Sequence, residues 1–180
     1  MTMRYEWLLP AMLGGVAAPM AQVAYATEYF SVEAAQKALF PDATAFEAVH
    51  VDAATRAAVA QEAGRFAGEP RIFRVRQGER ELGWFIVDEA IGKVELITYA
   101  LALDAHGVVK GLEIMAYRET HGDGVRLSAW RAQFTGKRSS DPVRLDADIR
   151  NISGATLSCR HVTEGVRRLL LLYERALAHA

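Results

Sequence analysis

The fold is decided by two apolar runs, VELITYALAL at residues 94–103 and VVKGLEIMAY at residues 108–117, with the sequence DAHG at residues 104–107 between them. Aliphatic, β-branched and aromatic residues fill both runs, and each has a length typical of a strand. A glycine in a four-residue connection favours a tight turn. The stretch therefore predicts an antiparallel hairpin, and the alternation along residues 112–116 predicts one buried face.

A second hairpin is predicted from residues 71–76 and 82–87, which flank the turn residues Gln77-Gly78-Glu79. Helices are predicted at residues 31–40, 52–63, 125–134 and 158–178. The last of these repeats apolar side chains at i, i+4, i+7 and i+8, the pattern of a long amphipathic helix. Strands in hairpin order with helices at both ends predict an α+β fold: a mostly antiparallel β-sheet flanked by helices, with a long C-terminal helix.

The composition is that of one folded globular domain. The chain has 180 residues, of which 51% are apolar and 24% charged, and its formal net charge is -1. A nucleic-acid partner is not expected, because phosphate binding normally needs a basic excess. The single cysteine excludes an internal disulfide and thiolate metal clusters, and the five histidines lack metal-ligand spacing, so no metal site is expected.

The first 26 residues differ from the rest of the chain. Residues 7–18 read WLLPAMLGGVAA without a charge, Pro19 follows, and Ala24-Tyr25-Ala26 fits a small-x-small cleavage signal. These features are typical of a secretory signal peptide. About 20 residues from position 7 onward are also enough to span a bilayer, so a retained anchor is an alternative, and an ordinary buried helix is a third.

The predicted domains are therefore residues 1–26, a signal peptide or an N-terminal membrane anchor, and residues 27–180, a single domain. With either kind of N-terminal segment, the domain would work outside the cytoplasm. The predicted location is periplasmic or otherwise extracytoplasmic, with a possible inner-membrane anchor.

Chemistry is expected at Ser153-Gly154-Ala155-Thr156, just before the last predicted helix. Small residues let the backbone approach a bulky ligand closely. The helix N-terminus that follows offers unpaired N–H groups and the positive end of the helix dipole, which suit a phosphate. The hydroxyls of Thr156 and Ser158 are placed to face that phosphate. The alternative from the same residues is that Thr156 or Ser158 is only an N-cap and Gly154 only a turn residue.

Further motifs accompany this element in order: YRETHGDGVR at residues 117–126, QFTGK at residues 133–137 and DI at residues 148–149. Together with the first hairpin, they resemble the FMN-binding domain family. That family includes the flavinylated C and G subunits of the sodium-pumping NADH:quinone reductase and Rnf complexes, and many small exported relatives. The resemblance covers residues 92–168, a little under half of the chain.

The resemblance implies FMN as the cofactor and Thr156 as its covalent attachment residue. In the family, the last threonine of the motif carries FMN through a phosphoester bond, and a separate FAD:protein FMN transferase installs it from FAD. By that match Ser153, Gly154 and Ala155 shape the recognition turn, while Leu157 and Ser158 flank the phosphate.

The resemblance also places the loop that contains Glu119, Thr120, Gly122 and Gly124 beside the flavin. Lys93 is a candidate partner of the phosphate or of the reduced flavin. The alternatives are a simple turn at the loop and a solvated lysine at the start of a strand.

One position departs from the family pattern. Many members carry an acidic residue six positions before the threonine, where this chain has Arg150. Asp148 is acidic and nearby but two residues displaced. Either Asp148 serves in its place, or Arg150 changes how the transferase docks.

These features predict an extracytoplasmic electron-transfer flavoprotein that takes electrons from a membrane or periplasmic partner through the FMN on Thr156. No catalytic residue is predicted, so an electron carrier is favoured over a stand-alone enzyme. A tether keeps the flavin on the protein where free FMN is dilute. The alternatives are an extracytoplasmic flavin-dependent reductase and a non-flavinylated structural or docking subunit of a membrane redox complex.

Overall fold

The computed structural model describes residues 27–118 and 121–179. Its centre is a six-stranded antiparallel sheet in the order β1-β6-β5-β4-β3-β2. β3 pairs with β4, β4 with β5 and β5 with β6, as expected for consecutive hairpins. The strands are β1 (Thr27–Glu28), β2 (Ala45–Val49), β3 (Arg71–Gln77), β4 (Arg80–Ile91), β5 (Leu96–Asp104) and β6 (Val109–Tyr117).

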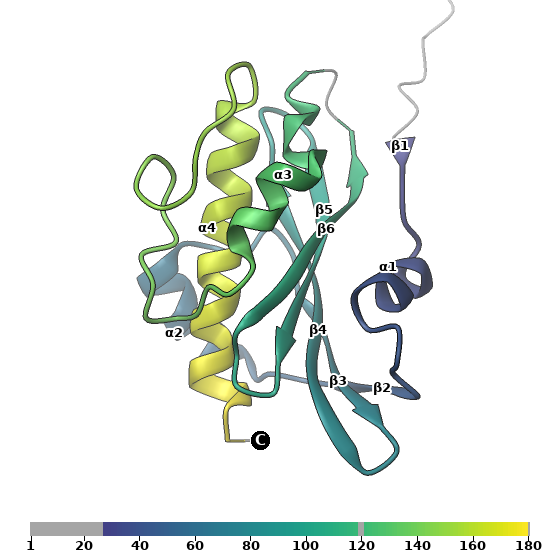
Figure 1. The fold of residues 1–180 in the computed structure, drawn as a ribbon. Coiled ribbons are helices and arrows are strands. Elements are labelled where there is room, and N and C mark those ends of the chain that lie inside the picture. Colours follow the sequence, from purple (N-terminus) through teal and green to yellow (C-terminus); the bar gives the residue numbers. More distant parts are fainter. Residues whose placement is uncertain (1–26, 119–120, 180) are drawn as a thin grey trace, which may run out of the picture.

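Helices cover both faces of the sheet (Figure 1). On one face α4 (Thr156–Leu172) runs along the sheet beside α2 (Ala53–Ala63), and on the other lies α1 (Val32–Leu39). A π-helical turn, η3 (Tyr173–Leu177), follows α4. Short helical turns follow β6: η1 (Asp123–Arg126), α3 (Ser128–Arg131) and η2 (Ala132–Phe134).

The two faces of the sheet bury two separate clusters, because successive side chains of a strand point to opposite sides. The larger cluster lies under α4 and includes Trp84, Tyr99 and Leu101; the smaller lies under α1 and includes Phe85 and Ala100. Both faces of β6 are covered, since Ile114 belongs to the first cluster and Met115 to the second. The sequence had predicted only one buried face there.

The α+β fold predicted from the sequence is confirmed. Ser31 caps α1 and Asp52 caps α2, each by accepting a hydrogen bond from the backbone N–H three residues later. The short strand β2 was missed because AFEAV contains two alanines and a glutamate and carries little strand signal. The predicted helix at residues 125–134 is broken, since Leu127 adopts an extended conformation (φ -59°, ψ 125°).

Helix α4 packs on β5 through an unusually close contact. A Cβ atom on Gly165 would lie 2.2 Å from Oη of Tyr99, so only glycine allows this approach of helix to strand. The Tyr99 hydroxyl donates a 2.6 Å hydrogen bond to Asp88, which also faces Arg168 of α4 at 3.5 Å. Burial raises the pKa of the Asp88 carboxyl, while the Tyr99 hydrogen bond and the Arg168 charge oppose that shift.

This packing sets the start of α4 beside one end of the sheet. The same end holds the connection between β4 and β5 and the end of β6, because Ile97 of β5 pairs with Tyr117. Within residues 27–118 and 121–179, no helix is long and apolar enough to cross a membrane.

We predict that Gly165→Ala destabilises the fold, although alanine favours a helix by about 1 kcal/mol over glycine. The added methyl group collides with Tyr99, and overpacking of this kind costs about 1–3 kcal/mol. Urea unfolding measures the change, with Glu164→Ala on the exposed side of the same helix as the matched control. A Gly165→Ala protein more stable than the wild type would contradict the packing described.

Candidate functional site

The N-terminus of α4 is built by Gly154 and Ala155. Gly154 adopts φ +83°, a backbone conformation that favours glycine, and Ala155 is the N-cap residue without a side-chain capping bond. Thr156 is the first helical residue and is exposed. The helix starts two residues earlier than the sequence predicted, and neither Thr156 nor Ser158 is an N-cap. The first N–H groups of α4 are therefore available to a ligand.

The hydroxyl oxygen of Thr156 is oriented by Asn151. The Asn151 Nδ2 group donates a 3.0 Å hydrogen bond to Thr156 Oγ1, and its Oδ1 accepts from the backbone N–H of Ile152 at 2.8 Å. An amide N–H only donates, so Asn151 cannot take the hydroxyl proton. The group in direct contact with Thr156 therefore positions the oxygen without acting as a base.

Behind Thr156, a chain of hydrogen bonds ties α4 to the end of β6. The Tyr117 hydroxyl donates to the backbone carbonyl of His121 at 2.6 Å and lies 2.9 Å from Oγ of buried Ser158. Because the tyrosine proton goes to the carbonyl, Ser158 donates to Tyr117. Gly122 has φ +90°, and a Cβ atom there would lie 2.8 Å from the Tyr117 hydroxyl. Glycine is required for this loop to approach the helix.

These elements enclose a hollow of about 440 Å3 at the start of α4. Its cationic side chain is Lys93, from the connection between β4 and β5, and His121 lines it from the loop after β6. The helix dipole adds a positive end to the same space. The lining residues are Lys93, Val94, His121, Gly122, Gly154, Ala155, Thr156, Leu157 and Ser158.

Most of the site residues predicted from the sequence meet in this hollow: Lys93, Gly122, Gly154, Ala155, Thr156, Leu157 and Ser158. Ser153 is exposed in the turn just before it, and Gly124 packs against Ile152 instead of lining it. Glu119 and Thr120 lie outside the described residues. In the part of the chain that the structure describes, no three His, Cys, Asp or Glu side chains gather as a metal site.

Val94, Asn151 and Tyr117 have roles that the sequence did not predict. Val94 was assigned to a strand, but β5 begins at Leu96 and Val94 lines the hollow. Tyr117 was included in the sequence analysis only as part of a motif, and Asn151 was not singled out. The five-residue separation of Asn151 from Thr156 carries no known signal, and Tyr117 becomes relevant only when β6 meets α4.

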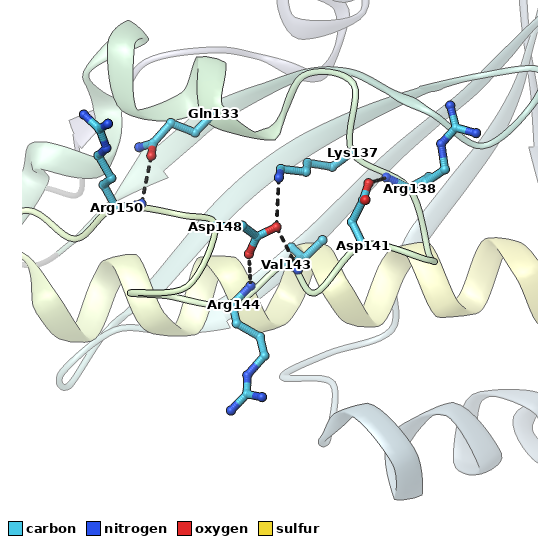
Figure 2. Close-up of polar contacts among 8 residues, drawn as sticks. All are labelled: Gln133, Lys137, Arg138, Asp141, Val143, Arg144, Asp148 and Arg150. Carbon is cyan, nitrogen blue, oxygen red and sulfur yellow. Dashed lines mark hydrogen bonds and ion pairs between the residues drawn. The ribbon is translucent and has the colours of Figure 1, made fainter.

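The carboxylate of Asp148 clamps its own loop by binding backbone and side-chain groups within it (Figure 2). Its carboxylate accepts from the N–H of Arg144 at 2.8 Å and of Val143 at 3.2 Å, and it pairs with Lys137 at 2.8 Å. Partial burial acts to raise its pKa, but the Arg144 N–H and Lys137 hold the pKa of Asp148 below its usual value. The clamp therefore stabilises the fold above the usual carboxyl pKa and weakens as pH falls below it.

Within residues 27–118 and 121–179, Arg150 makes its hydrogen bonds through its backbone alone. Its N–H donates to Oε1 of Gln133 at 2.8 Å, and its carbonyl accepts from Nε1 of Trp130 at 2.8 Å. The Arg150 side chain is exposed and points away from Asp148 (Figure 2). Of the two residues considered at this place in the motif, Arg150 is the one that faces solvent beside the site.

Comparison with known proteins agrees with this geometry. Residues 92–171 match the family model of the FMN-binding domain. This match confirms the resemblance that the motifs carried, and it points to FMN as the cofactor.

A curated relative is the G subunit of a Na(+)-translocating ferredoxin:NAD(+) oxidoreductase complex from Acetobacterium woodii. It is 30% identical over 92 residues, which cover 46% of this chain and 43% of the relative. The alignment therefore spans less than half of the length of that relative.

The residues present fit FMN. The flavin phosphate is an anion, and the hollow offers the free N–H groups of α4, the ammonium group of Lys93 and the exposed Thr156 hydroxyl. Val94 and Leu157 add apolar surface of the kind that a flavin ring contacts. The donor set and the space are thus those of a phosphate-bearing aromatic cofactor.

We predict that Asp148→Asn loosens the loop beside the site. The substitution removes the Lys137 ion pair and weakens two backbone hydrogen bonds, and hydrogen bonds to a charged group are worth about 1.5–3 kcal/mol. Amide hydrogen exchange at Val143 and Arg144 should accelerate about tenfold or more. Asp146→Asn, an exposed change in the same loop, is the matched control and should leave both amides as they are. Unchanged exchange in Asp148→Asn would show that the carboxylate is no clamp.

Proposed function

We propose that the protein is an extracytoplasmic electron carrier whose FMN is joined through a phosphoester bond to Thr156. The observation that carries this proposal is the exposed Thr156 hydroxyl at the start of α4, on the edge of a hollow lined by Lys93 and His121. When bound, the flavin ring supplies the electron-transfer chemistry, and the chain supplies position and electrostatics.

The chain's own residues would act mainly on the phosphate. The N–H groups in the first turn of α4 would bind its oxygens, and Lys93 would balance its charge. Gly154 and Ala155 carry little side-chain volume, which leaves the approach to Thr156 open. Leu157 and Val94 would shield part of the ring from water. Ser158 would act through Tyr117, by fixing the glycine loop against the helix.

Thr156 would receive its flavin from an FAD:protein FMN transferase. The threonine oxygen attacks the FMN phosphorus of FAD, AMP leaves, and the hydroxyl proton is released. The structure supports the need for an outside enzyme, because Asn151 donates to the hydroxyl and supplies no base. The exposed Arg150 would then be part of the surface that the transferase meets.

The location and the partners follow from the sequence and from the relative. Residues 7–18 and the Ala24-Tyr25-Ala26 site support export, or a membrane anchor, for a single domain at residues 27–180. The A. woodii relative belongs to a ferredoxin:NAD(+) oxidoreductase complex, which supports a membrane redox complex as the electron partner here. Electrons would pass between that partner and the flavin.

We predict that the chain co-produced with a flavin transferase gains about 438 Da, the mass of FMN less water, on the peptide that contains Thr156. Thr156→Ala should lose both this mass and the in-gel flavin fluorescence of the denatured protein. Thr135→Ala, another exposed threonine, is the matched control and should keep them. Persistent fluorescence in Thr156→Ala would reject the site.

The N-terminal segment gives a separate prediction. After expression with export, the mature protein should begin at Thr27, because the small-x-small site ends at Ala26. Intact mass and N-terminal sequencing measure this. Ala26→Asp should block cleavage. Ala18→Asp places a charge in the apolar run at residues 7–18 and tests whether that run directs export. A cytoplasmic protein with residues 1–26 intact would contradict both the signal peptide and the extracytoplasmic location.

A further inference from the structure

Large exposed apolar side chains gather around the start of α4. Within residues 27–118 and 121–179, the large hydrophobic side chains that stand out as exposed are Ile91, Val94, Leu127 and Leu157, with exposed fractions of 56%, 76%, 58% and 42%. Val94 and Leu157 line the hollow at the start of α4. Leu127 lines a neighbouring hollow of about 510 Å3 with Arg150, and Ile91 lines a third with His161. Exposed apolar side chains concentrated at one end indicate an interaction surface.

The end of the domain at which α4 begins carries an excess of basic residues, although the whole chain has a formal net charge of -1. We define the α4 N-terminal end as residues 91–95, 117–118, 121–127 and 150–160. These segments contain five Lys or Arg and two Asp or Glu, a formal charge of +3, which leaves -4 on the rest of the chain. Arg150 and Arg160 are exposed there, and the positive end of the α4 dipole adds to the field. The surface therefore suits an anionic partner.

The described chain also begins at this end. Thr27 of β1 pairs with Tyr117, the last residue of β6. The 26 residues before Thr27 include the uncharged run at residues 7–18. A segment of that composition directs a chain to a membrane, whether or not it is later cleaved. The N-terminal segment therefore joins the domain at the end that carries the exposed apolar side chains and the excess of basic residues.

We infer that the α4 N-terminal end lies against an anionic phospholipid surface. Arg150 and Arg160 would contact the lipid phosphates, while Ile91 and Leu127 would enter the interface, joined by Val94 and Leu157 where a flavin does not cover them. The choice of a lipid surface over an acidic protein rests on Thr27, which joins this end to a segment whose composition directs the chain to a membrane. The inference goes beyond the electron-carrier proposal and does not need bound flavin.

Depth-dependent quenching tests the orientation. The full-length chain without flavin is labelled with an environment-sensitive fluorophore at Val94→Cys, at Leu127→Cys or, at the opposite end, at His106→Cys. Native Cys159 is buried, and burial raises the pKa of its thiol, so it should stay unlabelled. The unsubstituted chain, treated identically, checks this.

Vesicles of phosphatidylglycerol and phosphatidylcholine with brominated acyl chains then quench labels that reach the lipid. Labels at positions 94 and 127 should be quenched severalfold more than the label at position 106. Equal quenching at the three positions, stronger quenching at position 106, or no quenching at all would overturn the inference. The last result is the one expected if an acidic protein covers this surface instead.

Charge reversal tests the lipid chemistry. Arg150→Glu with Arg160→Glu should reduce quenching at position 94 by more than half on phosphatidylglycerol vesicles, as should raised salt. Lys37→Glu with Arg80→Glu changes the net charge equally at exposed positions on α1 and at the start of β4, and should leave the quenching unchanged. Equal losses in the two pairs, or none, would overturn the inference. Because the chain carries no flavin, none of these outcomes depends on modification of Thr156.

Discussion

The structure depends on the close packing of α4 against β5. Gly165 lets the Tyr99 hydroxyl approach within a distance that any side chain would block, and that hydroxyl binds Asp88 opposite Arg168. Asp88 Oδ1 and Arg168 Nε have no hydrogen-bond partner in the described residues, so this buried pair is a costly element. The contacts of Tyr99 and Asp88 with α4 fix the position of this helix along the sheet. The first turn of the helix then lies beside the end of β6 and the β4–β5 connection.

The site follows from that placement. Ser158 meets Tyr117, Tyr117 holds the carbonyl of His121, and the glycine loop closes on the helix. Thr156, at the first position of the helix, is left exposed with its oxygen oriented by Asn151. In the proposed site, the binding energy for a phosphate would come from the backbone N–H groups of α4 and from Lys93. This accounts for a site in which the residue that contacts the threonine hydroxyl is not a base.

The sequence predicted the sheet, the long helix and the glycine-rich turn because each has a local signal: alternation, apolar spacing and a run of small residues. It did not predict β2, whose alanines lack strand preference, nor the break at Leu127. In the site, the motif predicted Thr156 and its neighbours. The roles of Tyr117, Asn151 and Val94 depend on contacts between distant segments, which local patterns do not encode. The sequence could not decide whether Asp148 or Arg150 acts at the place of the family's acidic residue. That choice depends on the contacts by which the Asp148 carboxylate holds its own loop.

The most direct test of the central claim is the 31P resonance of the flavinylated protein, unfolded in guanidinium and titrated between about pH 5 and pH 8. A phosphoester to Thr156 is a diester without a proton to lose in this range, whereas the phosphate of free FMN is a monoester with a second pKa near 6. The account predicts one resonance that stays with the protein on dialysis and does not move with pH. A resonance that shifts through this range, or that dialyses away, would contradict it.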